Sequence, residues 1–194
     1  MPAKPISRRS FLKSSSTLAK GSFIALTAPA ILAACRQAEE NIGSTEPSFS
    51  TLTEIEGKEL RAIAARIVPT DETPGAEEAG VIYFIDAVLG DNAEKEYGQV
   101  RSALREIQAE SGIKFGASYF FELTAEQQDQ VLTDIETTPF FATIRYLTIA
   151  GMFSLPEYGG NKDKIGYKLI GFNDAHAWSA PYGFYDADYA LKGE

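Results

Sequence analysis

His176 is the only histidine of the chain and the residue best suited to acid–base chemistry. An imidazole beside the carboxylate of Asp163, Asp174 or Asp186 would form a general base for hydrolysis or proton abstraction. No motif joins these residues, however, and the sequence around His176 is rich in aromatic side chains. A lone histidine in such a setting more often packs or forms hydrogen bonds, so we assign no catalytic residue to this chain.

The sequence also lacks the residue sets and motifs of the common metal and cofactor sites. One histidine and one cysteine cannot supply a multi-histidine metal site, an iron–sulfur cluster, a c-type haem or a four-cysteine zinc site. Neither a Rossmann glycine fingerprint nor a P-loop is present. Four acids lack the spacing of a calcium loop, and we interpret them as a solvated face. They are Asp71, Glu72, Glu77 and Glu78. We expect no metal and no cofactor in this chain.

The N-terminal sequence SRRSFLK, residues 7–13, has the pattern of a targeting signal. Its arginines Arg8 and Arg9 are followed by Phe11, Leu12 and a weakly hydrophobic run. This arrangement resembles the twin-arginine signal with which bacteria export folded proteins. Proteins are usually exported in the folded state because they acquire a cofactor in the cytoplasm. We therefore expect the twin-arginine translocase to be a partner, and a cofactor to be involved.

The single cysteine, Cys35, ends the sequence ILAAC, which fits the lipobox of bacterial lipoproteins. The hydrophobic stretch from Gly21 to Ala34 is too short for a stable membrane span, as expected of a cleavable signal. We interpret residues 1–34 as a twin-arginine signal peptide and Cys35 as the lipidated residue. Cleavage after Ala30 by the ordinary signal peptidase is the alternative. The expected location is periplasmic, with a lipid anchor in the membrane.

The rest of the chain divides into a tether and one domain. Residues 35–50 are polar and have no apolar period, as expected of a flexible tether. Residues 51–194 have the length and composition of one ordered domain. Loss of the five basic residues in 1–34 would change the net charge from −9 to −14. So acidic a body is repelled by nucleic acid, and we exclude nucleic acid as a partner.

Apolar periodicity and capping motifs predict a mainly α fold of about five helices. Thr53 and Thr124 each begin a capping box, and Thr138-Pro139 supplies a cap and a first-turn proline. Pro74 is expected to lead into the second helix, and Gly112 to end the third. The predicted helices span about 53–68, 81–89, 94–111, 124–135 and 138–153. From 154 onward we expect a long irregular segment rich in glycine and aromatic residues.

Two blocks of the sequence resemble a known family. They are RIVPTDETPGAEEAGVIYFIDAVL (66–89) and MFSLPEYGGNKDKIGYKLIGF (152–172). Similar blocks in this order mark the gluconate 2-dehydrogenase subunit 3 family, in which a TPGAxxAG loop precedes a helix containing FID. Its later YGGN sequence leads into G[WY]KLIG[FY]. Tyr167 stands where tryptophan is more frequent in that family. The resemblance covers about residues 50–190 and is specific because two separated blocks agree.

The resemblance implies a non-catalytic small subunit of a periplasmic, membrane-associated dehydrogenase of sugars, gluconate or glycosides. In that family the partner is similar to the glucose–methanol–choline oxidoreductases, contains FAD, and passes electrons to a c-type cytochrome. The twin-arginine signal would then serve the flavoprotein, which must bind FAD before export. The alternative is a stand-alone periplasmic lipoprotein that stacks carbohydrate on the aromatic side chains of its C-terminal segment. These are Tyr158, Tyr167, Trp178, Tyr182 and Phe184.

We predict that the YGGN block forms the interface with this partner. Adjacent glycines suit a positive φ or a close approach of two backbones, and rigid aromatic side chains are typical of binding hot spots. The assigned residues are Tyr158, Gly159, Gly160, Asn161, Tyr167 and Phe172. On this interpretation Gly160→Val and Asn161→Ala weaken assembly and leave the domain folded. The alternative is that the segment wraps over its own helices and that the interface lies at the loop 69–80.

Overall fold

A computed structural model describes residues 22, 48–90, 93–172 and 174 of the chain. Several predicted residues lie outside this part, and their assignments stay predictions. They are Arg8, Arg9, Phe11, Leu12, Cys35, His176, Trp178, Tyr182, Phe184 and Asp186.

Over the described residues the chain forms six α-helices, three short 3-10 helices and no strand. In chain order these are α3 (Glu54–Ile67), α4 (Val81–Val88), α5 (Glu94–Phe115), η1 (Phe120–Glu122), α6 (Ala125–Asp134), α7 (Pro139–Phe153), η2 (Pro156–Tyr158), η3 (Lys162–Lys164) and α8 (Ile165–Leu169). The predicted mainly α fold is confirmed. None of the helices in this described part has the length and apolar character needed to span a membrane.

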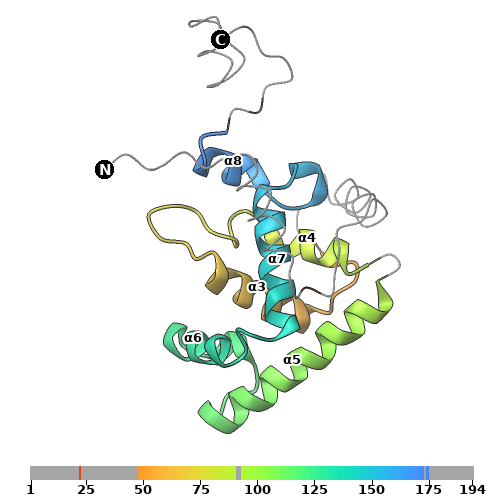
Figure 1. Ribbon diagram of the computed structural model, residues 1–194, viewed down its shortest axis with the longest axis vertical. Helices are drawn as coiled ribbons and strands as arrows, with labels where there is room; N and C mark the ends of the chain where they lie inside the picture. The colour runs from red at the N-terminus through yellow and green to blue at the C-terminus, as the bar shows by residue number, and fades with distance from the viewer. Residues whose placement is uncertain (1–21, 23–47, 91–92, 173, 175–194) are drawn as a thin grey trace, which may run out of the picture.

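The helix α7 runs through the middle of the fold, with α3 and α4 packed against it (Figure 1). The long helix α5 and the shorter α6 lie together toward one end of the molecule, and α8 lies at the other end. Side chains from the three central helices are fully buried, among them Leu60, Ile85, Ile144 and Leu147. Their burial provides the main stabilisation of the fold.

The predicted helix starts are confirmed where a side-chain cap marks them. The Thr53 amide donates to the Glu56 carboxylate at 2.9 Å, and the Glu56 amide donates to the Thr53 hydroxyl at 3.3 Å. Thr124 and Gln127 form the same reciprocal pair at the start of α6. Thr138 caps α7, with the proline in the first turn. These caps satisfy amides that the helix itself leaves unpaired.

The predicted end of the third helix is wrong, and so is the role expected of Pro74, although the second helix begins at Val81 as predicted. The helix α5 does not end at Gly112 but continues to Phe115, and Gly116 with φ of 72° terminates it. The left-handed conformation that ends a helix is therefore adopted four residues later. Pro74 does not lead directly into a helix, because residues 76–80 form turns and Gly80 has φ of 66°. A left-handed residue interrupts a helix, so α4 begins only at Val81.

The segment after 153, predicted to be irregular, contains the short helices η2, η3 and α8. Each has only three to five residues, which is too few for an apolar period to be detected. The described residues thus form one α-helix more than the five predicted from the sequence.

Candidate subunit interface

The YGGN block packs directly on the backbone at the end of α7. A Cβ atom added to Gly160 would overlap the carbonyl oxygen of Gly151 and lie 2.9 Å from its carbonyl carbon. A Cβ atom on Gly166 would overlap the carbonyl oxygen of Met152. Only glycine permits so close an approach of two backbones, which explains both glycines.

Asn161 joins this packing with its side chain and is fully buried. Its Nδ2 donates to the carbonyl oxygen of Ser154 at 2.8 Å, and its Oδ1 accepts the amide of Gly166 at 2.8 Å. The next residue, Lys162, donates its amide to the carbonyl of Ala79 at 3.0 Å. Asn161 has φ of 49°, a left-handed conformation that asparagine adopts more readily than most residues. We call Gly160, Asn161 and Gly166 the backbone lock, because they hold the block on α7.

The predicted interface residues therefore differ widely in their exposure. Gly160 and Asn161 are buried in the backbone lock, Tyr158 and Gly159 are half-buried, and Tyr167 is 8% exposed. Phe172 is 51% exposed, and its ring meets that of Tyr167 edge-on with 4.9 Å between centroids. Burial, together with the charge of Asp174, raises the pKa of Tyr167. Gly160 and Asn161 therefore serve the internal packing of the fold, whereas Phe172 lies on the surface.

The sequence did not indicate several further exposed apolar side chains in the C-terminal part of the described residues. Seven large hydrophobic side chains of the described residues are exposed, and five of them lie between 153 and 172. We call these five the apolar end of the molecule: Phe153, Leu155, Leu169, Ile170 and Phe172. Phe153 and Leu169 are the last residues of α7 and α8, and the other three follow these two helices in the sequence. Helix α8 lies at one end of the fold (Figure 1). Consecutive apolar residues in LIGF are a signal that could have indicated this surface, since a helix as short as α8 cannot bury them all.

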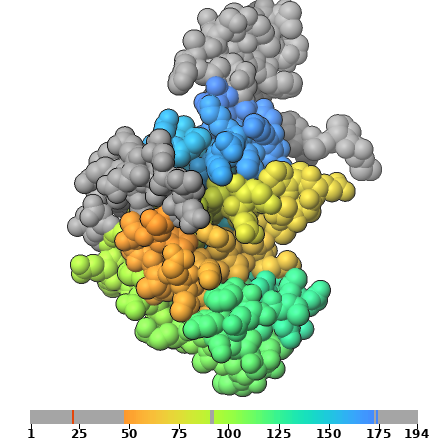
Figure 2. All heavy atoms as spheres, turned by 180° about the vertical axis from the view of Figure 1, so that it is seen from behind, coloured from red at the N-terminus to blue at the C-terminus, as the bar shows by residue number. Residues whose placement is uncertain are grey.

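The space-filling view shows this part of the chain at one end of the described body, beside the loop 69–80 (Figure 2). The acids of that loop, predicted to form a solvated face, are exposed. Asp71 accepts the amide of Thr73 at 2.8 Å, and Glu78 accepts the hydroxyl of Thr70 at 2.6 Å. These hydrogen bonds lower the pKa of both carboxyls and order the loop. The described residues contain no group of three or more His, Cys, Asp or Glu that could hold a metal ion.

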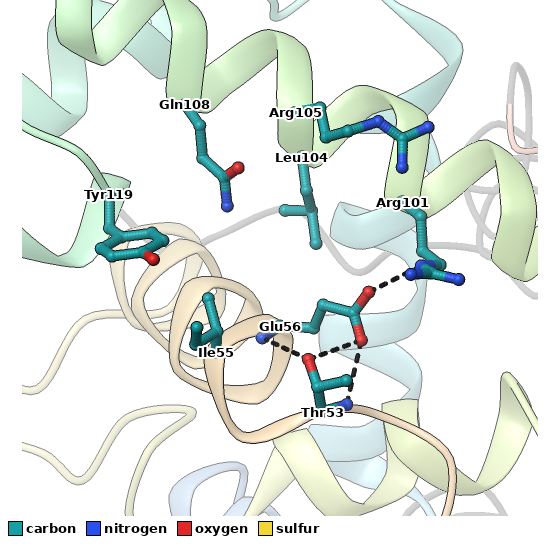
Figure 3. A pocket seen from close by; sticks show the side chains of 8 residues that line it. All are labelled: Thr53, Ile55, Glu56, Arg101, Leu104, Arg105, Gln108 and Tyr119. Carbon is teal, nitrogen blue, oxygen red and sulfur yellow. Dashed lines mark hydrogen bonds and ion pairs between the residues drawn. The ribbon is translucent and has the colours of Figure 1, made fainter.

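A shallow groove of about 260 Å³ lies between α3 and α5 (Figure 3). Glu56 accepts from Thr53 within it and pairs with Arg101 at 2.9 Å. Partial burial opposes ionisation of Glu56, but hydrogen bonds from Thr53 and Tyr97 and the charge of Arg101 lower its pKa overall. Burial and the same hydrogen bond to Glu56 raise the pKa of Tyr97 to about 12. The carboxylate in this groove thus serves the helix cap.

Two buried carboxylates outside the groove also serve the fold. Asp86, in the FID sequence, accepts the amides of Ser50, Thr51 and Leu52 at 2.8 to 3.0 Å. It fixes the start of the folded domain on α4. Glu59 accepts from the Gln108 side chain at 3.1 Å and from two amides of η1 at 3.2 and 3.3 Å. Burial raises the pKa of Glu59.

The candidate acid–base residues within the described part are not arranged around a reactive centre. Asp174 forms an ion pair with Lys164 at 2.7 Å, and this contact raises the pKa of the lysine. Asp163 is exposed in η3, with φ of 55°. The position of His176 lies outside the described residues.

No curated protein and no solved structure matches this chain. The sequence profile of the gluconate 2-dehydrogenase subunit 3 family matches residues 54–174, which extend from the first residue of α3 to the ion pair of Asp174 beyond α8. Both blocks quoted above lie within this match. The chain therefore belongs to the gluconate 2-dehydrogenase subunit 3 family.

Proposed function

We propose that this chain is the non-catalytic small subunit of a periplasmic, membrane-associated, FAD-dependent dehydrogenase of sugars, gluconate or glycosides. The observation that carries the proposal is the family match across 54–174, since the family is named as a subunit of gluconate 2-dehydrogenase. The geometry agrees with an accessory role, because the buried carboxylates Glu59 and Asp86 are both engaged in internal hydrogen bonds.

The partner in this proposal is a flavoprotein similar to the glucose–methanol–choline oxidoreductases. It binds FAD in the cytoplasm and is then exported in the folded state with this subunit, whose residues Arg8 and Arg9 are recognised by the twin-arginine translocase. Lipidation of Cys35 holds the complex at the membrane, where a c-type cytochrome accepts the electrons. Hydride and electron transfer are the work of the partner's cofactors.

Replacement of both Arg8 and Arg9 by lysine tests this function. Lysine keeps the charge but lacks the planar guanidinium group, so the export signal should fail. We expect both this chain and the flavoprotein to accumulate in the cytoplasm, measured by fractionation and by the flavin spectrum of each fraction. The control is Lys4→Arg, which changes a basic residue outside SRRSFLK. Normal periplasmic levels of the flavoprotein in the double variant would show that it does not depend on this subunit for export.

A further inference from the structure

The apolar end exposes more hydrophobic surface than folding alone requires. Ile170 is 62% exposed, Phe172 51%, and Leu169 42%. Phe153 and Leu155, at the end of α7, are 37% and 40% exposed. Single exposed hydrophobic residues are common on soluble proteins, but a cluster of five in twenty residues of sequence is typical of an interaction surface.

The backbone lock holds this surface in place. Gly160 and Gly166 lie against the carbonyl groups of Gly151 and Met152, and Asn161 bonds to the main chain on both sides of the block. Phe153 and Leu155 thus lie at and just after the end of α7, next in sequence to Met152, and Leu169 follows Gly166 by three residues at the end of α8. A surface fixed before binding loses less conformational entropy when a partner docks.

The backbone between the glycines is also strained. Asp163 and Lys164 have φ of 55° and 57°, in the left-handed region that non-glycine residues seldom occupy. Such conformations persist only where the surrounding structure enforces them, and they cluster at functional sites. Their position between Asn161 and Gly166 of the backbone lock agrees with a surface kept rigid for binding.

The charges around the apolar end favour a protein over a lipid surface. Three lysines in the block, Lys162, Lys164 and Lys168, are balanced by Glu157, Asp163 and Asp174. An anionic membrane attracts a surface with an excess of positive charge, which is absent here. Lys162 and Lys168 are exposed, and neither has an ion pair within the described part of the chain. They can meet carboxylates at the rim of a partner's apolar patch.

We infer that the apolar end is the docking surface for the FAD-containing subunit, and that it fits an apolar patch of that subunit flanked by carboxylates. This inference rests on the function proposed above. It differs from the interface predicted from sequence, since Gly160 and Asn161 support the surface from inside, and Leu169 and Ile170 make the contact.

The test compares co-purification of the tagged full chain from membranes of its native host. The double variant Leu169→Glu/Ile170→Glu places two carboxylates on the apolar end, next to the expected carboxylates of the partner. Ile113→Glu is the matched control, because Ile113 is 86% exposed near the end of α5, outside this surface. The readout is the flavin recovered with each variant, and the urea midpoint of the isolated chain checks that it stays folded.

We expect the double variant to recover at least about tenfold less flavin than the wild type, as for residues at the centre of an interface. Ile113→Glu should recover the wild-type amount. Should the folded double variant keep its flavin, the docking surface is elsewhere, while the proposed function stands on the flavin recovered by the wild type. If the wild type itself recovers no flavoprotein, both proposals fail.

One single variant covers the case in which the double variant unfolds, and two further measurements exclude other occupants. If the double variant unfolds, Lys168→Glu, which alters only an exposed rim residue, should still reduce recovery of the flavin. Binding of the chain carrying Cys35→Ser to anionic vesicles, lost on Leu169→Glu/Ile170→Glu while flavin recovery is kept, would identify a membrane surface instead. A dimer of the wild type that the same variant dissociates, again with flavin recovery kept, would identify a second copy. Either result overturns the inference.

Discussion

Gly160→Ala tests whether the YGGN block is fixed by its own fold. The added Cβ would overlap the carbonyl oxygen of Gly151, which belongs to the backbone of the central helix and cannot rotate away as a side chain could. The block must therefore shift outward. Overpacking of this kind costs about 1–3 kcal/mol, and weakening one of the two hydrogen bonds of Asn161 adds about 1 kcal/mol. We expect a loss of about 2–4 kcal/mol.

The assay is urea unfolding of the isolated chain, followed by its helical circular dichroism. With a slope of about 2 kcal/mol per molar urea, a loss of about 3 kcal/mol lowers the midpoint by about 1.5 M. Gly98→Ala is the control, because Gly98 lies inside α5 and nothing lies within 4 Å of an added Cβ. Alanine there should stabilise the chain by about 0.5–1 kcal/mol.

An unchanged midpoint for Gly160→Ala, with the expected gain for Gly98→Ala, would refute the close packing of the block on α7. The structure here reverses the expectation drawn from the sequence, in which Gly160→Val spared the isolated domain and weakened only its assembly. Valine brings a larger side chain than alanine against the same carbonyl group. Loss of the partner in that variant would therefore follow from loss of the fold.

Two further predictions concern the buried carboxylates. Asp86→Asn replaces one acceptor of the amides of 50–52 by a donor, and we expect a loss of about 2–4 kcal/mol in the same urea assay, with faster proteolysis at the start of the domain. A urea midpoint of Asp86→Asn equal to that of the wild type would contradict this role of Asp86. Burial raises the pKa of Glu59 above 4.5, so its contribution to stability is greatest below that pH and is lost as the pH rises through its folded pKa. Relative to the wild type, Glu59→Gln should therefore gain stability as the pH rises from 4 to 7. Glu56→Gln should lose stability relative to the wild type over the same range, because the pKa of Glu56 is lowered. Parallel profiles of unfolding free energy against pH for the three proteins would argue against this assignment.

Local sequence signals predicted the parts of the fold that depend on local contacts. The capping boxes at Thr53 and Thr124 bond over three residues, so the motif and its structure coincide. Gly112 was assigned wrongly because a glycine can lie inside a helix or end it, and the choice depends on the following turn. There Gly116 adopts the left-handed conformation instead.

The roles of the buried polar residues depend on partners far away in the sequence. Asp86 binds amides 34 to 36 residues earlier, and Glu59 binds groups 49 to 62 residues later. No periodicity within one helix shows such partners. The same holds for Gly160: its sequence indicates a close approach to another backbone, but only the fold shows that this backbone belongs to α7.

The backbone lock and the apolar end divide the C-terminal block into two kinds of residue that respond differently to substitution. Gly160, Asn161 and Gly166 are buried, so their variants lower the stability of the isolated chain and thereby its assembly. Leu169 and Ile170 are exposed, so their variants lower assembly and leave the urea midpoint unchanged. Because a stability defect can mimic an assembly defect, both quantities must be measured on each variant. A plot of flavin recovery against urea midpoint should place the lock variants along one declining line and Leu169→Glu/Ile170→Glu below it. If all variants share one line, the block acts on the partner only through the stability of this chain.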